Sequence, residues 1–504
     1  MKHAKFRISQ LLSLVLTLVW MLIFVGCGSG LTPSEGVADG QTVATTTATT
    51  AAQASDSTTT ATTAATTAAT TEAASTTAVT TTTEATTATI TTVICTGPPT
   101  DRYGVPDKLS GQKITMFIWW NATEEDQRRV AYYEQRTGIE VSFETSSLEE
   151  YQSTLSARMM ANNAPALAAI RSEWYPLPIT RGLMQPIANT GWDFTNQNDD
   201  IYALDLMDQF AYKGVCYGVA LKGSLASDYA VMYFNKDILK AKGVKEDPYE
   251  LWRQGRWNWD TCLSIAKQCT DAKQNQYGVA TLADYYWMLS ADQDLILSEA
   301  DGLKNNAQSE QVLDAWVHAV DMVYTHLVTV LDFANREERF YSGRTAMLGA
   351  SSSLMKTAAD GVDRVTFDWG IVPFPSPKGQ SAVAACEGVV WGFPAKVTGD
   401  KLQAAMWWLR YYLDDFAYGS EDVYPTNECW EVLYWMSTGQ MRSLNSVSVL
   451  CYGGECDPQK VDRSILNSAL IDTSGINYRA ILRTTLGSVS STLEKNMAKI
   501  ENEV

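Results

Sequence analysis

The stretch from residue 41 to residue 92 consists almost entirely of Thr and Ala, and it limits which part of this chain can fold. It holds almost no large apolar residue, so it cannot bury enough surface to offset the entropy that folding costs. We therefore expect residues 27–110 to form a disordered linker, whose threonines are candidates for O-glycosylation. A flexible chain of about 80 residues has an r.m.s. span near 50 Å. Ordered structure should begin near residue 111.

The first 26 residues have the three parts of a secretory signal. Lys2, Lys5 and Arg7 form a positive segment, and an apolar run follows from residue 11 to residue 25. This run is about 15 residues long, whereas a helix that spans a bilayer needs about 20. The segment therefore predicts export of the chain, with residues 1–26 as a signal peptide.

The end of this segment resembles a bacterial lipoprotein signal, in which a small residue precedes a lipidated cysteine. Gly26 and Cys27 fit that pattern, while Phe24 stands where Leu is usual. The resemblance implies that a lipid on Cys27 anchors the exported protein to the outer face of the cell membrane. The alternative is an uncleaved signal that itself serves as the anchor.

Charge and histidine content exclude several classes of protein. The formal net charge of −18 repels nucleic acid and anionic lipid headgroups. Only His318 and His326 occur in the folded part, so few histidines are available for a catalytic zinc site or a Ser-His-Asp triad. We expect a protein that is not an enzyme and that needs neither metal nor cofactor. Of the nine cysteines, Cys451 and Cys456 flank a turn-like segment and could form a disulfide, and most others should be free.

Strands and helices alternate from residue 113 onward. Residues 113–119 form an apolar run, and a helix should follow from a capping-box start at Thr123 to Gly138. An alternating strand at 139–143, a helix near 148–162 and an apolar strand at 166–170 come next. This order predicts an α/β fold with helices on both faces of a mainly parallel sheet. Ligands bind such sheets beyond the carboxyl ends of the strands. That rule brings together two groups of residues: Trp119, Trp120 and Asn121, and Glu173, Trp174 and Tyr175.

Later segments continue the pattern. Strands are expected at 217–221 and 229–234, a strongly apolar helix at 402–413, and a closing helix at 491–500. Trp407 and Trp408 lie inside the apolar helix and should belong to the core.

The order of several motifs resembles the extracellular solute-binding proteins of family 1, a sugar-binding group that includes maltose-binding protein. The resemblance covers about 390 residues, and each motif is weak alone, but five in the right order are specific. The motifs are Tyr-Glu-Gln-Arg-Thr-Gly-Ile-Glu-Val at 133–141, Met-Tyr-Phe-Asn-Lys-Asp-Ile-Leu at 232–239, Asp-Pro-Tyr-Glu-Leu-Trp at 247–252 with Trp-Asn-Trp-Asp at 257–260, Phe-Tyr-Ser-Gly-Arg-Thr-Ala-Met at 340–347, and Phe-Asp-Trp-Gly-Ile-Val-Pro-Phe-Pro at 367–375 followed by Gly-Val-Val-Trp-Gly at 388–392.

The resemblance implies a two-lobed, periplasmic-binding-protein-like fold of type II, with mixed sheets flanked by helices and a ligand cleft between the lobes. The first lobe would comprise 112–224 plus 368–416, and the second 225–367 plus 417–504. Such a protein is a monomer that closes on its ligand and delivers it to the permease subunits of an ABC importer. One departure is Ala166, which follows Pro165 where the family usually has Asp.

A sugar offers apolar C–H faces and a rim of hydroxyl groups, so its site needs flat aromatic rings and planar polar groups. The chain holds 16 Trp and 23 Tyr, of which those at strand ends are the best candidates. Besides the two groups above, the resemblance places candidates at a lobe crossing, on an aromatic platform and in two loops. These are Asp228, Asp284, Tyr285, Tyr286, Trp287, Ser351, Glu387 and Trp391.

Two other functions stay open at this level. An acidic, Trp-rich, Thr-linked secreted chain also describes a glycosidase or carbohydrate-binding protein, and a glycosidase needs only two carboxylates about 5–10 Å apart. A receptor for another solute is the third possibility. Glu173 and Asp228 would suit a polyamine, whereas a sugar phosphate would require basic residues in the cleft.

Overall fold

A computed structural model of the chain describes residues 104–195, 201–222, 227–281, 285–329, 335–355, 365–414, 426–454, 457–471 and 477–503. All of these lie in the second of two units, Thr96–Val504, into which the chain divides. The signal segment, Cys27 and the Thr/Ala stretch lie outside the described residues, as do Asp284 and Cys456. Within the described residues, no helix is both long and apolar enough to cross a membrane.

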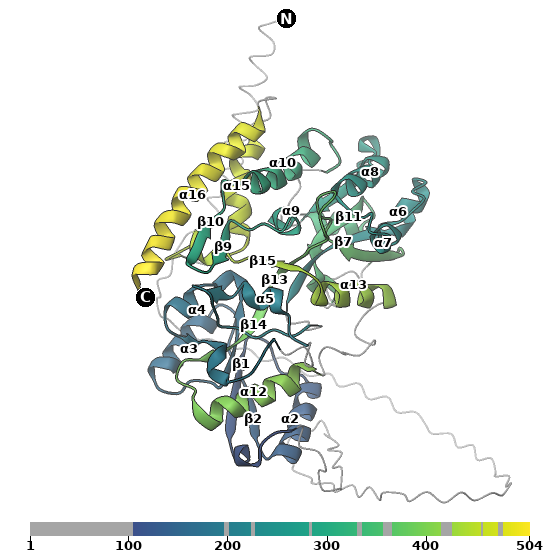
Figure 1. Cartoon of the computed structure of the whole chain (residues 1–504). Helices are drawn as coiled ribbons and strands as arrows, with labels where there is room; N and C mark the ends of the chain where they lie inside the picture. Colours follow the sequence, from purple (N-terminus) through teal and green to yellow (C-terminus); the bar gives the residue numbers. More distant parts are fainter. Residues whose placement is uncertain are drawn as a thin grey trace, which may run out of the picture. The chain divides into compact units, whose positions relative to one another are not determined.

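The first sheet has five strands in the order β2-β1-β3-β14-β4 (Figure 1). β1 runs parallel to β2 and β3, while β14 pairs antiparallel with β3 and β4, so the sheet is mixed as expected. Its strands are β1 (Lys113–Ile118), β2 (Glu140–Thr145), β3 (Leu167–Arg171), β4 (Met184–Gln185) and β14 (Val389–Pro394).

Successive residues of β1 contact helices on opposite faces of this sheet, because side chains alternate along a strand. The sulfur of Met116 accepts a hydrogen bond from Nε1 of Trp408 on α12 (Gly399–Asp414). Phe117 points the other way, and its ring stacks on Tyr151 of α3 (Tyr151–Met160) at 4.4 Å. Trp408 is fully buried, which confirms the prediction that it belongs to the core.

The helix α2 (Glu124–Thr137) begins and ends where its capping residues predict. Thr123 and Asp126 form a capping box, and Gly138 adopts a left-handed conformation at the C-terminal end. Asp126 is buried, and its second carboxylate oxygen accepts a hydrogen bond of 2.9 Å from the hydroxyl of Tyr412. One carboxylate therefore caps α2 and joins it to α12.

The second sheet has β7 near its centre, in the order β15-β13-β7-β11-β8, with β12 also paired to β7. Every residue of β7 after Asp228 is buried, which suits a strand covered on both faces. Its strands are β7 (Asp228–Asn235), β8 (Tyr277–Thr281), β11 (Thr345–Ser351), β12 (Trp369–Pro373), β13 (Ala384–Glu387) and β15 (Met441–Ser443). The helices of this region are α6 (Lys236–Ala241), α7 (Pro248–Arg253), α8 (Trp259–Cys269), α9 (Tyr285–Ser290), α10 (Glu310–Tyr324), α11 (Arg336–Tyr341) and α13 (Asn427–Thr438).

Two details differ from the sequence-based expectations. β12 and β13 pair with β7 in the second sheet, although they fall within 368–416, which was assigned to the first lobe. Only β14 and α12 of that segment join the first sheet, because strand pairing is non-local and motif order does not determine it. Residues 217–221 do not form a strand either, since only isolated bridges occur there, at Val219 and Leu221.

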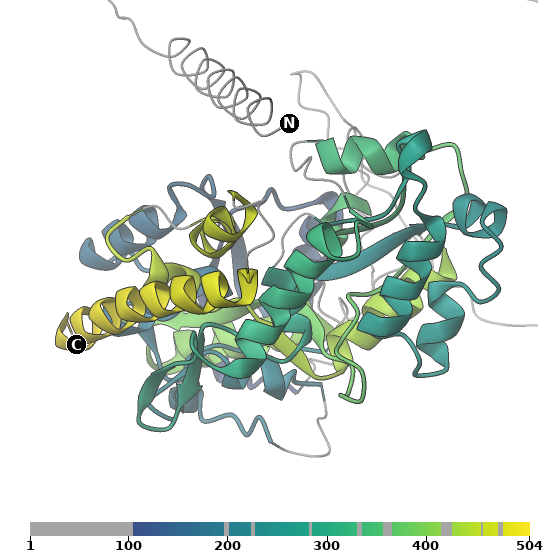
Figure 2. The same cartoon turned by 90° about the horizontal axis from the view of Figure 1, so that it is seen from above.

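The C-terminal part is helical and comprises α14 (Val447–Leu450), α15 (Gln459–Ile471) and α16 (Tyr478–Glu503). α16 is much longer than the helix expected at 491–500, because its first half is rich in Ser and Thr and so lacks a strong helical signal. Figures 1 and 2 both show α16 lying beside α15 and α10.

The hydrogen bond between Tyr412 and Asp126, which links α12 to α2, predicts how removal of the Tyr412 hydroxyl affects stability. Tyr412→Phe removes a donor from the buried Asp126 carboxylate and should lower the free energy of unfolding by about 1–3 kcal/mol, measured by urea denaturation. Tyr434→Phe, on a ring that is 40% exposed, should change it by less than about 0.5 kcal/mol. Equal urea midpoints for Tyr412→Phe and the wild type would show that this bond does not join the helices.

Candidate functional site

The chain passes from the second sheet to the first at Gly388. Glu387 is the last residue of β13, and Val389 is the first residue of β14. A Cβ atom on Gly388 would lie 2.6 Å from both Leu206 and Ser443, so only glycine fits there without displacement. Its amide donates to Ser443 Oγ at 2.9 Å, and its carbonyl accepts from the amide of Ser172 at 2.7 Å. The crossing is thus held tightly in place.

Strand register brings charged residues together at this crossing. Glu387 pairs with Asp228 across β13 and β7, and Arg171 pairs with Val389 across β3 and β14. One nitrogen of the Arg171 guanidinium donates to Glu173 at 2.8 Å and to Glu387 at 3.0 Å. These three side chains are only 6–16% exposed. Arg171, Glu173, Glu387, Asp228 and Tyr285, described next, are called the crossing cluster below.

Tyr285, the first residue of α9, completes the cluster. Its hydroxyl donates a hydrogen bond of 2.7 Å to the second oxygen of Glu387. Burial, followed by the charge of Glu387, raises the pKa of this tyrosine well above its ordinary value. Tyr285 therefore stays protonated and acts as a donor. Its own amide donates to the Asp462 carboxylate of α15 at 2.9 Å, which fixes the start of α9.

The electrostatics of the cluster follow from one cation among three carboxylates. Burial raises the pKa of Glu173 to about 7, with Glu387 and Asp228 adding repulsion and Arg171 opposing the shift. Burial also raises the pKa of Glu387, again against the effect of Arg171. Although burial disfavours the charged guanidinium, the three carboxylates raise the pKa of Arg171. The cluster thus keeps its cation at every relevant pH, while Glu173 and Glu387 ionise less readily than exposed glutamates do.

Aromatic rings lie directly beside these charges. The Arg171 guanidinium lies 5.8 Å from the ring centre of Trp119, within the range of a cation–π interaction. Trp119 makes edge contacts with Trp120 at 4.9 Å and with Trp174 at 5.5 Å. Trp120 in turn contacts Trp391 at 5.9 Å. Trp119 and Trp120 are half-buried, whereas Trp174 and Trp391, which pack against them, are buried.

Many of the residues predicted as ligand contacts therefore lie close together in the structure, either in the crossing cluster or among the neighbouring Trp rings. These are Trp119, Trp120, Glu173, Trp174, Asp228, Tyr285, Glu387 and Trp391.

Other candidates lie elsewhere or make different contacts. Tyr175 turns its hydroxyl to Ser298 Oγ at 2.6 Å and to a backbone carbonyl, away from the cluster. Ser351 bonds Ser353 at 2.8 Å. Asn121 is exposed. Asp284 lies outside the described residues.

The aromatic platform expected at 285–287 is instead largely core. Trp287 is 1% exposed and packs against Phe374 at 4.6 Å and His318 at 4.7 Å. Tyr286 is equally buried and contacts Phe374 at 5.6 Å. Neither ring offers a face to a ligand in this conformation. The sequence could not reveal this, because these residues open a short helix whose buried side depends on distant strands.

Arg171 is the residue of the crossing cluster that sequence reasoning missed. It ends the buried strand β3 and closely precedes Glu173, Trp174 and Tyr175, which were predicted to contact a ligand. A basic residue that closes an apolar strand next to such candidates could have served as the signal.

The chemistry available here is polar recognition. Two carboxylates, a guanidinium and a tyrosine hydroxyl are planar or directional groups that accept from and donate to hydroxyls, and the Trp rings supply flat apolar surface. Across the described ranges, no group of three His, Cys, Asp or Glu residues could hold a metal ion.

Comparison with known proteins identifies the family and the fold. A family described as bacterial extracellular solute-binding protein matches residues 128–417. A cyclo/maltodextrin-binding protein complexed with maltotetraose is similar in structure, with 14% identity, a TM-score of 0.56, and coverage of 79% of this chain and 97% of that one.

Two further solved structures are similar to this chain over a comparable length. The sugar-binding protein MalE from Xanthomonas citri has 14% identity and a TM-score of 0.56, over 77% of this chain and 99% of its own. A solute-binding protein from Staphylococcus aureus in complex with maltose has 11% identity and a TM-score of 0.55, over 77% and 98%. No curated protein matches in sequence. The fold is thus the two-lobed, type II periplasmic-binding-protein fold, which confirms the predicted class.

The raised pKa of Glu173 predicts a pH dependence of stability. A carboxyl with a folded pKa near 7 binds more protons than its unfolded form between about pH 4.5 and 7. Its stabilising contribution is therefore present at acidic pH and lost as the pH rises through 7, by at most roughly 3 kcal/mol. Relative to Glu173→Gln, the wild type should lose melting temperature from pH 5 to pH 8.

Thermal unfolding of both proteins across this pH range tests the shift. Glu149→Gln, at an exposed position, is the control and should follow the wild type at every pH. Parallel curves for the wild type and Glu173→Gln would contradict the prediction.

Proposed function

This chain belongs to the bacterial extracellular solute-binding proteins, and we propose that it captures a carbohydrate, an oligosaccharide rather than a single sugar, for an ABC importer. The observation that carries the proposal is the crossing cluster beside the half-buried rings of Trp119 and Trp120. Planar charged groups next to flat rings match the hydroxyl rim and C–H faces of a sugar. The similar structures from Xanthomonas citri and Staphylococcus aureus are described as sugar-binding and maltose-bound, which supports the same ligand class.

Lobe closure would act directly on the crossing cluster. The sheet pairings favour a first lobe of 112–224 and 388–416, and a second of 225–387 and 417–504. With this division Arg171 and Glu173 belong to the first lobe, while Asp228, Tyr285 and Glu387 belong to the second. A ligand that bonds both groups would hold the lobes closed.

The arrangement argues against a glycosidase. Glu173 and Glu387 accept from the same guanidinium nitrogen, so their bonded oxygens lie within about 6 Å of each other, a separation that a retaining glycosidase would use. In such an enzyme the scissile bond lies between the two carboxylates. Here that space is filled by Arg171, which forms ion pairs with both.

The acidic side chains of the cluster keep a cationic solute such as a polyamine as the second candidate. Three carboxylates surround one cation in the cluster. Calorimetry against neutral oligosaccharides and spermidine distinguishes the two ligand classes, and product analysis on the same samples detects any hydrolysis. Binding of an oligosaccharide without turnover supports the proposal, whereas hydrolysis by the purified protein would overturn it.

Export and tethering complete the proposal. Residues 1–26 would be removed as a signal peptide, and Cys27 would carry a lipid. The Thr/Ala-rich part of residues 27–110 would serve as a flexible leash, which ends before the 3-10 helix Asp107–Leu109, where Leu109 is buried. A receptor held near the membrane stays close to its permease, while the leash lets it collect solute at a distance.

The ring of Trp120 should contribute to affinity. Trp120→Ala removes a half-buried stacking surface and should weaken oligosaccharide binding by about 10- to 100-fold, because a well-placed aromatic contact is worth about 1–3 kcal/mol. Isothermal titration calorimetry measures the change. Trp430→Ala, on a half-buried ring of α13, is the matched control and should bind as the wild type does. Unchanged affinity in Trp120→Ala would remove this ring from the site.

The anchor can be tested separately. Cys27→Ala should release the protein from the membrane fraction into the medium, because it removes the acceptor of the lipid. Fractionation of cells followed by immunoblotting measures the distribution, with Cys216→Ala as a control that should stay membrane-bound. Full retention of Cys27→Ala would identify an uncleaved signal segment as the anchor.

A further inference from the structure

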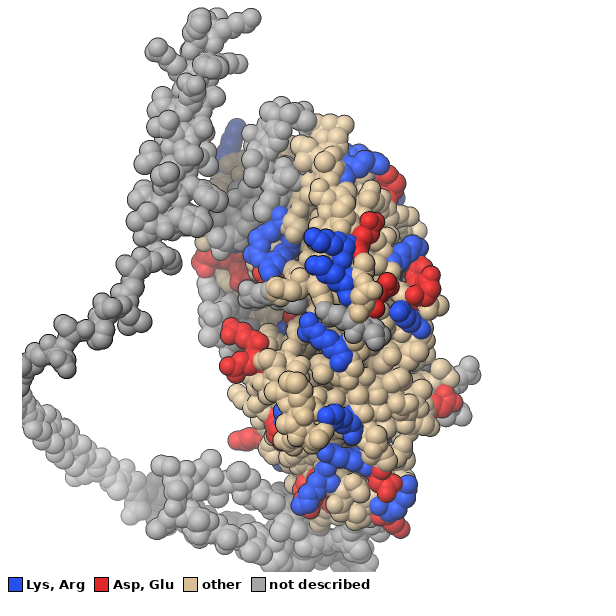
Figure 3. Space-filling model, turned by 90° about the vertical axis from the view of Figure 1, so that its left-hand side faces the viewer, with Lys and Arg blue, Asp and Glu red and all other residues tan. Residues whose placement is uncertain are grey.

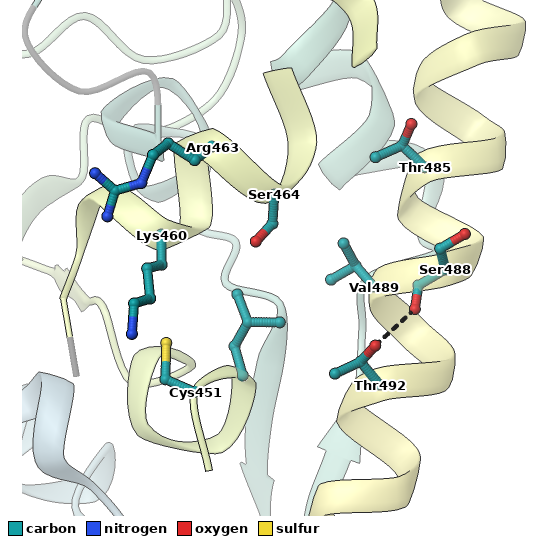
Figure 4. Close-up of a pocket in the computed structure, with 9 residues that line it drawn as sticks. Cys451, Lys460, Arg463, Ser464, Thr485, Ser488, Val489 and Thr492 are labelled. Carbon is teal, nitrogen blue, oxygen red and sulfur yellow. Dashed lines mark hydrogen bonds between the residues drawn. The ribbon is translucent and has the colours of Figure 1, made fainter. Parts of the chain in front are cut away.

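A second cavity lies among the C-terminal helices, away from the crossing cluster. It has a volume of about 440 Å³, within the range of about 300–1,000 Å³ that small-molecule sites occupy. Figure 4 shows Ser464 of α15 opposite Val489 of α16 across it, while the Arg463 guanidinium turns away from α16. The lining residues are Leu450, Cys451, Lys460, Arg463, Ser464, Thr485, Ser488, Val489 and Thr492.

The charged residues that line this cavity are basic. Lys460 and Arg463 lie one turn apart on α15, and Figure 4 shows the Lys460 amine turned toward Cys451. The acidic residue of the same turn, Asp462, points away and accepts from the amide of Tyr285. Asp457 forms an ion pair with Arg463. Lys460 and Arg463 thus both line the cavity, with Arg463 half exposed and paired to Asp457, in a chain whose formal net charge is −18.

The opposite wall carries hydroxyl groups on one face of α16. Thr485, Ser488 and Thr492 are spaced three and four residues apart, so they line up along the helix. Ser488 and Thr492 donate to backbone carbonyls of their own helix, at 3.4 and 3.1 Å. Each oxygen therefore keeps lone pairs that can accept hydrogen bonds from a ligand. Leu450 and Val489 add apolar surface between the two walls.

Charged side chains of both signs lie on the surface around the cavity. Figure 3 shows Lys and Arg side chains at several places on the face that carries α16. α16 contributes Arg479, Arg483, Lys495 and Lys499 but also Glu494 and Glu501, and the two arginines form ion pairs with Glu310.

We propose that this cavity is a second ligand site, which binds a sugar-sized organic anion through Lys460 and Arg463. The carboxylate or phosphate of the ligand bonds the two cations, and its hydroxyl groups donate to the Ser and Thr oxygens of α16. The site shares no residue with the crossing cluster, so the proposal does not depend on which solute the crossing cluster captures.

Cys451 lines the cavity and provides the measurement. In the full chain, modification of Cys451 by a maleimide is followed by peptide mass spectrometry, with glucuronate, glucose 6-phosphate, inorganic phosphate or neutral glucose present. Glucuronate and glucose 6-phosphate should slow modification of Cys451 at least threefold, and glucose should not. Cys216, half-buried at another place, is the internal control and should react at the same rate throughout.

Variants of the cavity make the test specific. Lys460→Gln and Arg463→Gln should abolish the protection by anions, whereas Lys495→Gln, on an exposed turn of α16 outside the cavity, should retain it. Ser488→Trp, at an exposed position, should fill the cavity without disturbing the core. It should therefore slow the modification of Cys451 by the maleimide even when no anion is present.

Three results would overturn the proposal. The first is equal rates with and without every anion. The second is protection that survives Lys460→Gln undiminished. The third is equal protection by inorganic phosphate and by both sugar anions at the same concentration, which would leave a simple anion site with no role for the hydroxyl wall. Calorimetry of Trp120→Ala with oligosaccharide reports on the crossing cluster independently.

Discussion

The ion pairs of Arg171 hold together the point at which the two sheets meet. β13 and β14 are consecutive strands of different sheets, separated only by Gly388, and the register of β13 with β7 sets Glu387 opposite Asp228. Like charges in that arrangement repel each other. Arg171, brought alongside by the pairing of β3 with β14, supplies the compensating charge. Loss of one partner from a buried pair typically costs about 3–5 kcal/mol, so the crossing depends strongly on this one side chain.

The same residues serve the fold and the proposed binding site. Glu387 accepts from Arg171 on one oxygen and from Tyr285 on the other, so it contacts elements of both proposed lobes. A solute that bonds these groups must exchange hydrogen bonds with them, and the lobes then respond to its presence. This coupling explains why Glu173 and Glu387, two carboxyls whose pKa values are raised, lie beside the crossing rather than on a peripheral loop.

Local pattern predicted the first sheet and much of the site because strand ends are local features. The apolar run before Trp119 and the run before Glu173 ended where β1 and β3 end, and parallel strands necessarily place those ends at one edge. The pattern failed where sheet membership or burial depends on distant residues. β12 joins β7 rather than the first sheet, and Trp287 packs on Phe374 instead of facing a ligand. Arg171 was overlooked because a charged strand end resembles a solvated one unless its partners, 2 and 216 residues away, are known.

The helix α15 connects the two parts of the molecule on which the proposals rest. Lys460 and Arg463 line the second cavity, while Asp462 between them turns to the amide of Tyr285. Tyr285 then donates to Glu387 at the crossing. Each of these steps is a direct hydrogen bond or a single helical turn. If an anion in the cavity displaced α15, one of two things would follow. Either the hydrogen bond from the Tyr285 amide to Asp462 would break, or the start of α9 would move with α15. The second outcome would change the hydrogen bond that Tyr285 donates to Glu387.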